Sequence, residues 1–311
     1  MNRIEKIPVP VVPTMLSLLT LSNVYGGLGY TAFRYTSMMI GTVFLLVYLL
    51  KIIMFNETFR KEYSGMVPSS LYAGFTMCLM VLGSFFHEMG FSFGKPVWIA
   101  AVFVHLIHLV IFILRFIVLK RSWETTMPCW FVTLNGIMVS CVTGGAMDFK
   151  WLLVPITYYG IAIYLCCLPF MIYRLLKKPI PKGTFHTQAI LLAPVSLCIV
   201  SVINVLDSKP AGLMYLLLAL YLLTILFIVC MLPKFFSFKF YPGYAGLTFP
   251  MAIGIVACNK AAVYFGETLG NSALAIFLQQ LSGFLVFFTS MLVGYVLLKF
   301  TAMMFNVKDA E

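Results

Sequence analysis

Charged residues of either sign are scarce in this sequence. Asp, Glu, Lys and Arg account for 10% of its 311 residues, and hydrophobic residues account for 62%. A soluble domain typically carries about 25% charged residues, so the composition excludes an ordinary soluble fold. It also excludes a nucleic-acid-binding module despite the net charge of +11, because no polar stretch is long enough to form a basic, exposed domain.

Motifs for catalysis and for cofactor binding are missing as well. The sequence has no His-Glu-x-x-His helix, no phosphate-binding loop and no Gly-x-Ser-x-Gly elbow, and we therefore predict no enzyme, no catalytic residue and no cofactor. The eight cysteines form no Cys-x-x-Cys pair and lie within or beside apolar segments. We predict that they are small hydrophobic side chains in lipid rather than partners in disulfides.

Two histidines inside one apolar segment are the candidates for a metal site. His105 and His108 are three residues apart and would share one face of a helix. Two ligands could hold a metal ion together, but no third ligand is evident. Hydrogen bonds to a neighbouring helix, or a contact between subunits, are the simpler interpretation. We predict no metal site, although ionisable residues within a membrane are functional candidates by default.

Ten long apolar segments fill nearly the whole chain. A hydrocarbon core of about 30 Å needs about 20 apolar residues per helix, and most of the segments reach that length. We predict an all-α integral membrane protein with a single transmembrane domain over residues 1–311. The expected spans are about 9–30, 36–55, 67–87, 95–118, 127–145, 150–173, 186–206, 211–232, 242–265 and 271–304.

Basic residues are distributed unequally between the two ends of these spans. The N-terminus, the connections from even to odd spans and the C-terminus hold 16 of the 21 Lys and Arg residues. The connections from odd to even spans hold five, namely Arg34, Lys95, Lys150, Lys209 and Lys260. Cytoplasmic loops carry the excess of Lys and Arg. We therefore predict cytoplasmic N- and C-termini in the cell's inner or plasma membrane.

A proline recurs toward the cytoplasmic half of every odd span. Within a helix, proline removes a backbone hydrogen bond and causes a kink, which a membrane tolerates where protein or water satisfies the freed carbonyl. The prolines are Pro13, Pro68, Pro128, Pro194 and Pro250. Pro68 and Pro128 lie so close to the helix starts that they could instead be first-turn residues. The recurrence indicates five repeated helical hairpins whose odd helices share one environment.

The odd spans are also rich in small and polar residues, whereas the even spans are apolar. Small residues allow helix backbones to approach closely, and hydroxyl groups form hydrogen bonds between helices. We predict a quasi-fivefold ring of five hairpins, with the odd helices inside and lining a pore and the even helices outside. A tightly packed bundle without a pore is the alternative.

The inner helices contain no Asp or Glu in mid-span. Cation pathways and proton relays normally use such carboxylates, so a conduit lined by hydroxyl, amide and backbone groups favours anions. Lys260 lies near the outer end of the ninth span, where it would face anions or simply extend to the lipid interface. The predicted pore-lining residues are Pro13, Ser17, Thr20, Asn23, Ser70, Gly74, Thr133, Gly136, Ser140, Thr143, Pro194, Ser201, Gly246, Pro250 and Lys260.

Phe249 is the candidate gate. It directly precedes Pro250 in a span that also contains Gly243, Gly246 and Gly254. We expect the glycines to open space and the aromatic ring to fill it. A narrow apolar constriction excludes water and thereby blocks ions.

Four short motifs carry a family resemblance. They are Ile7-Pro-Val-Pro followed by Pro13, Phe59-Arg-Lys-Glu-Tyr63, Leu192-Ala-Pro194 and Thr248-Phe-Pro250. In this order and spacing the chain resembles, over essentially its full length, the tellurite-resistance/dicarboxylate transporter family, which includes the plant slow anion channels and fungal malate permeases. The resemblance implies the quasi-fivefold ring, a pore occluded by a phenylalanine at the position of Phe249, and a homotrimer with one pore in each protomer. Long cytoplasmic extensions are missing here, so the phosphorylation control of the plant channels is not implied.

The expected function is that of an anion channel or uniporter for small anions such as chloride or nitrate. The alternatives are a secondary transporter of C4-dicarboxylates such as malate and a tellurite-resistance-type exporter. Carriers usually bind substrate at the midplane beside an ion or proton site, and the missing carboxylates favour the channel. A scaffold without transport agrees less well with the polar odd helices. The expected partners are small inorganic or organic anions, the lipid bilayer and further copies in a homotrimer, with no nucleic acid.

Overall fold

The computed structural model describes residues 3–119 and 126–305, and this part of the chain is helical without a strand. Lys120, Arg121 and Lys308, which contribute to the expected asymmetry of charge, lie outside the described residues. The α-helices are α1 (Val11–Gly27), α2 (Thr31–Met54), α3 (Asn56–Ser64), α4 (Met66–Glu88), α5 (Gly94–Phe112), α6 (Trp130–Leu134), α7 (Val139–Thr143), α8 (Lys150–Lys177), α9 (Leu192–Val205), α10 (Ala211–Phe235), α11 (Thr248–Val263) and α12 (Ser272–Met304). Segments of 3₁₀ helix cover Gly136–Met138, Lys182–Leu191 and Pro242–Leu247, and π-helical turns cover Ile113–Leu119 and Tyr264–Thr268.

Eight helices within the described ranges are long and apolar enough to cross a membrane. They correspond to eight of the ten expected spans. The other two segments are helical but shorter. The first is α1, with 17 residues. The fifth is divided into α6, a 3₁₀ turn and α7.

The division of the fifth segment has a local cause. The Asn135 side chain, fully buried between α6 and the 3₁₀ turn, donates a hydrogen bond to the carbonyl of Gly160 in α8 at 2.9 Å. At Gly136, an added Cβ would lie 2.9 Å from the side chains of both His105 and Met77. This segment therefore breaks regular helix where α4, α5 and α8 all approach its backbone.

The helices differ in burial as their composition predicts. In α4, in the segment Lys182–Val205 and in the segment Pro242–Thr268, 72% to 89% of the membrane-length window is buried. In the even-numbered spans (α2, α5 with its π turn, α8, α10 and α12) only 33% to 39% is buried. The helices rich in small and polar residues lie inside, and the apolar ones carry the outer surface.

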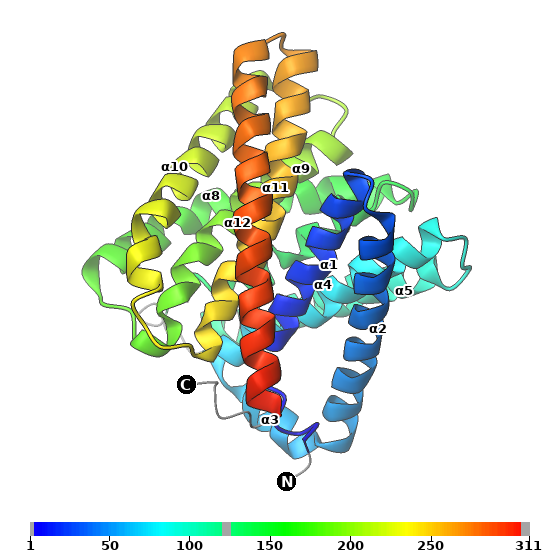
Figure 1. The fold of residues 1–311 in the computed structure, drawn as a ribbon, viewed down its shortest axis with the longest axis vertical. Helices are drawn as coiled ribbons and strands as arrows, with labels where there is room; N and C mark the ends of the chain where they lie inside the picture. Colours follow the sequence, from blue (N-terminus) through cyan, green and yellow to red (C-terminus); the bar gives the residue numbers. More distant parts are fainter. Residues whose placement is uncertain (1–2, 120–125, 306–311) are drawn as a thin grey trace.

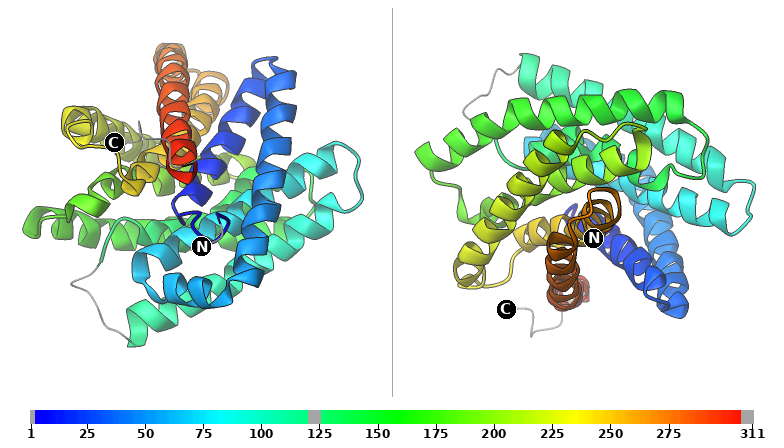
Figure 2. Two further views of the ribbon diagram at one scale, coloured as in Figure 1. Left: turned by 60° about the horizontal axis from the view of Figure 1, so that its bottom comes forward. Right: turned by 90° about the horizontal axis from the view of Figure 1, so that it is seen from above.

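The hairpins are inclined to one another rather than parallel. In Figure 1 and in the left view of Figure 2, α12 stands nearly upright while the green α8 lies across it. Among the inner segments, α1 packs against α4 and α11, α4 packs against α6 and α7, α7 packs against α9, and α9 packs against α11. Each inner segment thus has two inner neighbours.

The recurring prolines fall into two groups. Pro13 and Pro68 are each the third residue of an α-helix, and Pro128 precedes α6 by two residues. The first backbone N–H groups of a helix have no partner within the helix, so these three prolines remove no helical hydrogen bond, as the alternative for Pro68 and Pro128 foresaw. Pro194 and Pro250 instead lie inside continuous helical spans, two residues after the change from 3₁₀ to α-helix.

The short helix α3 is anchored by a buried ion pair. Lys51, at the end of α2, is fully buried, and its ammonium donates to both carboxylate oxygens of Glu62 at 2.8 and 2.9 Å and to the carbonyl of Ile7 at 2.8 Å. Tyr72 of α4 donates a further hydrogen bond to Glu62. The side chains of Arg3 and Phe305 are in contact beside this helix, so both ends of the described chain meet near α3 (Figure 1).

Candidate functional site

Two cavities lie on either side of Phe249. The larger, which we call the vestibule, has a volume of about 520 Å³ and is lined by residues of α1, α4, α7, α9 and α11, with Arg34 of α2 at its edge. The smaller, which we call the inner cavity, has a volume of about 30 Å³, the space of about one water molecule. Its lining comes from the same five inner segments, including the 3₁₀ turns that precede α9 and α11. Phe249, 7% exposed, lines both cavities.

The vestibule lies at the end of the bundle away from α3. Helix α4 begins directly after α3 and ends at Glu88, which lines the vestibule. Gly26, Gly27 and Gly145, at the turns from odd to even spans, also line it. The distribution of basic residues predicts that these turns lie on the outer side.

The glycines near Phe249 serve close packing rather than open space, contrary to the expectation from sequence. A Cβ added to Gly246 would lie 2.9 Å from the carbonyl oxygen of His186, and one added to Gly243 would lie 2.6 Å from that of Gly183. These contacts bring the backbone before α11 against the backbone before α9. Phe249 follows directly and is held where the two cavities meet.

The predicted pore-lining residues fall into three groups. Four line the vestibule: Thr20, Asn23, Thr143 and Lys260. Four line the inner cavity: Pro13, Gly136, Gly246 and Pro250. Seven line neither: Ser17, Ser70, Gly74, Thr133, Ser140, Pro194 and Ser201.

Gly74, Ser140 and Thr133 in the third group face neighbouring helices or their own backbone. A Cβ on Gly74 would meet the side chain of Val12 at 3.2 Å, so this glycine allows α4 to pack closely on α1. The hydroxyl of Ser140 donates to the carbonyl of Ile137 at 2.7 Å. Thr133 hydrogen bonds to the carbonyl of Ser70 at 3.3 Å.

The two histidines of α5 belong to the protein interior. His105 contacts the Thr76 hydroxyl through Nδ1 at 2.7 Å and the Thr133 carbonyl through Nε2 at 3.2 Å. His108 contacts the Tyr63 hydroxyl at 2.6 Å and the Thr133 hydroxyl at 3.3 Å. All four ring nitrogens thus have hydrogen-bond partners, which bears out the simpler interpretation. The described residues contain no group of three or more potential metal ligands.

Tyr63 extends this chain of hydrogen bonds to α3. It closes the Phe59-to-Tyr63 motif, and burial raises the pKa of its phenol above the ordinary value. A phenol that keeps its proton can donate to the Nδ1 atom of His108. The motif therefore ties α3 to the core twice, through Glu62 to Lys51 and through Tyr63 to His108.

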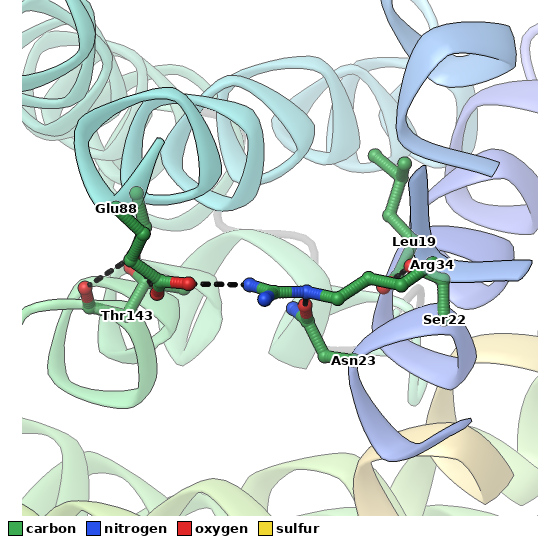
Figure 3. Close-up of polar contacts among 7 residues, drawn as sticks. Leu19, Ser22, Asn23, Arg34, Glu88 and Thr143 are labelled. Carbon is green, nitrogen blue, oxygen red and sulfur yellow. Dashed lines mark hydrogen bonds and ion pairs between the residues drawn. The ribbon is translucent and has the colours of Figure 1, made fainter. Parts of the chain in front are cut away.

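A charged cluster that the sequence analysis did not single out crosses the vestibule mouth (Figure 3). Arg34 extends from the start of α2 between α1 and α4. Its Nε donates to Asn23 Oδ1 at 2.8 Å, and its Nη2 donates to Glu88 Oε2 at 2.5 Å. The single hydroxyl proton of Ser84 is shared between the carbonyl of Thr143 at 3.0 Å and the other Glu88 oxygen at 3.3 Å.

Local sequence allows this arginine to lie where it does. A Cβ on Gly26 would come within 2.6 Å of the Arg34 Cδ atom, so glycine leaves a path for the side chain across α1. One signal in the sequence could have found this ion pair. Arg34 and Glu88 carry opposite charges, and both lie at turns predicted on the same side of the membrane. Lys260 also lines the vestibule, and it forms no ion pair with a described residue.

The chain matches known membrane transport proteins. A family model described as voltage-dependent anion channel (SLAC1) matches residues 9–303. Two proteins of Methanocaldococcus jannaschii, both named as uncharacterized transporters, are each 26% identical to this chain over 190 residues. These alignments cover 57% of this chain and 55% and 56% of the relatives, so the chain spans just over half the length of the curated relatives it matches.

Proposed function

The chain belongs to the SLAC1 family of voltage-dependent anion channels, and we propose that it conducts small anions such as chloride or nitrate through a pore that Phe249 closes. One observation carries this proposal. Phe249 lines both cavities, and the same five inner segments contribute to each of them. A path from the vestibule to the inner cavity would pass this ring.

The packing of the inner segments supports a central pore. Contacts run from α1 to α4, on to α6 and α7, then to α9, α11 and back to α1. We interpret this closed circuit as the quasi-fivefold ring, in a single ten-span domain over residues 1–311 in which α1 and the divided α6–α7 segment also cross the membrane. At the break in the fifth segment, the side-chain amide of Asn135 donates a hydrogen bond to the carbonyl of Gly160, a partner that lipid could not provide.

The charges along the path favour anions. Glu88 is the one acidic residue in the vestibule lining, and Arg34 holds it, while Lys260 contributes a second positive charge. The amide nitrogen of Asn23 adds hydrogen-bond donors, whereas the hydroxyl groups of Thr20 and Thr143 donate to the carbonyls of Leu16 and Val139. Such a mouth attracts anions and repels cations.

A coupled carrier for C4-dicarboxylates and a tellurite-resistance-type exporter remain the second candidates. The dimensions of the vestibule do not distinguish a dicarboxylate carrier from a chloride channel, because a volume of about 520 Å³ holds a dicarboxylate as easily as chloride. A coupled carrier would need an ion or proton site beside its substrate, and the path described here offers no buried carboxylate among its lining residues. We therefore favour the channel.

We also propose a homotrimer in the inner or plasma membrane, with both termini cytoplasmic. The apolar, largely exposed even helices provide the surface for lipid and for neighbouring protomers.

Thiol labelling in sealed vesicles tests this orientation. In a cysteine-free background, we expect Lys61→Cys in α3 to react only with reagent on the cytoplasmic side. Ser272→Cys, at the start of α12, should react only from the outside, because the basic residues concentrate at the α3 end. Both side chains are exposed. Labelling of the two positions from the same side would refute the topology.

Blocking the vestibule tests the proposed function. In liposomes, chloride or nitrate flux should be measured in a chain that also carries Phe249→Ala, so that the ring no longer limits flux. We expect a charged thiol reagent to abolish most flux through Thr143→Cys, because Thr143 lines the vestibule. Ser140→Cys, one turn earlier on the same segment, is the matched control because Ser140 is fully buried and lines neither cavity.

Two outcomes would contradict the proposal. Absence of anion flux from folded, reconstituted protein would argue against a channel. Flux that requires a counter-ion gradient would instead indicate the coupled carrier.

A further inference from the structure

The Arg34 guanidinium has capacity for a ligand beyond its present partners. An arginine carries five N–H donors, and the bonds to Asn23 and Glu88 use two of them. Donors on the same guanidinium therefore remain for an anion in the vestibule that Arg34 lines. Figure 3 shows the guanidinium at the middle of the mouth, between α1 and α4.

The ion pair between Arg34 and Glu88 is accessible, unlike the one that anchors α3. The side chains of Arg34 and Glu88 are 24% and 44% exposed, whereas Lys51 in the other pair is fully buried. Partly exposed ion pairs contribute little to stability and are screened by salt. An incoming anion can thus replace Glu88 on Arg34 without disturbing the fold.

The position of Glu88 makes this exchange easier. Glu88 is the last residue of α4, and the carbonyl groups at a helix C-terminus disfavour a negative charge. The carboxylate is therefore held there mainly by Arg34, with one hydrogen bond from Ser84. The contact of the Glu88 carboxylate with Arg34 also shows that the guanidinium can donate to a planar oxyanion at this position.

We propose that Arg34 forms an anion-binding site at the vestibule mouth and that the Glu88 carboxylate is a tethered competitor for it. The ligand is a small planar oxyanion, a carboxylate or nitrate, because such groups match the two parallel donors of a guanidinium. A group tethered by a short flexible link competes at a millimolar effective concentration. Glu88 would thereby keep the site closed to dilute anions and release it when the external concentration rises. This inference rests on the proposed anion conduction.

The test measures the half-saturating concentration for nitrate, acetate and chloride flux in liposomes, in chains that all carry Phe249→Ala. We expect Glu88→Gln to lower this concentration about tenfold for nitrate and acetate, and less for chloride, because it removes the competing charge and keeps the side-chain shape. Arg34→Gln should raise it about tenfold and cancel the effect of Glu88→Gln in the double variant. Arg34→Lys, which keeps the charge, should lose the preference for planar anions while folding normally.

Glu267→Gln is the matched control. Glu267 is exposed near the outer end of the segment that contains α11 and lines neither the vestibule nor the inner cavity. Glu267→Gln changes the charge by the same amount as Glu88→Gln, on the same face of the protein. We expect it to leave the half-saturating concentration unchanged. An equal shift from Glu267→Gln would reduce the effect of Glu88 to general surface charge and overturn the inference.

Failure of the two proposals can be distinguished. If flux is present but neither Glu88→Gln nor Arg34→Gln changes the half-saturating concentration, the tethered competitor is refuted and the channel stands. If flux is missing, nitrate binding is measured as the rise in melting temperature of detergent-solubilised protein. Glu88→Gln should then respond at about tenfold lower nitrate than the parent chain, and identical responses would overturn the inference.

Discussion

Replacement of Phe249 by alanine is expected to raise anion flux at least about tenfold over wild type, because each 1.36 kcal/mol removed from a barrier corresponds to about tenfold in rate. The ring lies between the vestibule and the inner cavity and lines both. An apolar constriction of this kind blocks ions by excluding water. Truncation to a methyl group would join the two cavities into one wetted path. No charged partner holds the ring in place, so we expect its truncation to leave the surrounding helices folded.

A graded series tests this reasoning. Phe249→Leu should give an intermediate flux, because leucine retains apolar bulk without the full ring. Met251→Ala is the matched control: Met251 lies two residues away on the same helix, is 3% exposed and lines neither cavity. It should lower stability without raising flux. If folded Phe249→Ala protein carries only the wild-type current, the ring is ordinary core packing.

Phe265 is unsuitable as a silent control, although its place near the outer end of the ninth span suggests one. It is fully buried, with its ring centre 4.9 Å from that of Tyr215 and 5.3 Å from that of Tyr264. Truncation of a buried phenylalanine typically costs about 3–5 kcal/mol. Phe265→Ala should therefore destabilise the protein while leaving the gate closed.

Residue composition predicts the helical fold and the burial of its helices well because the bilayer constrains both strongly. Lipid-facing helices must be apolar, while helices buried among others need small residues at their contacts. Gly74 on Val12 is such a contact. The same logic separates the buried α4 from the exposed α2, and the burial of the two helices agrees with it.

Periodicity was less informative within the divided fifth segment. A stripe at one-turn spacing assumes a continuous helix, and the change of helix type around Gly136 rotates the residues after it. Gly136 before the break lines the inner cavity, and Thr143 at the end of α7 lines the vestibule, while Thr133 and Ser140 line neither cavity.

The pairing of Arg34 with Glu88 depends on tertiary structure. The two residues are 54 positions apart and lie at different turns. Charge counts treat both as outer-loop residues, and only the packing of α1, α2 and α4 brings them together across the vestibule. The proline pattern was recognisable from sequence, but its role depended on where each α-helix begins.

Removal of the Glu62 carboxylate is expected to cause a large loss of stability. Glu62→Ala would leave the Lys51 ammonium fully buried with the carbonyl of Ile7 as its remaining hydrogen-bond acceptor among the described residues. Breaking a buried ion pair from one side typically costs about 3–5 kcal/mol. The Glu62 side chain is 24% exposed, so water can partly replace it, and we expect a loss near the lower end, about 3 kcal/mol. Thermal unfolding in detergent would show this as a lower midpoint temperature.

The matched control is Glu57→Ala on the same short helix. Glu57 is exposed and forms no ion pair with a described residue, so its removal should change stability by no more than about 0.5 kcal/mol. The double variant Lys51→Met with Glu62→Gln removes both charges and should recover most of the loss, because replacing a buried pair by uncharged groups is often neutral or stabilising. Equal stability of Glu62→Ala and Glu57→Ala would mean that Lys51 reaches water at the membrane surface and that α3 is held chiefly by Tyr63 and His108.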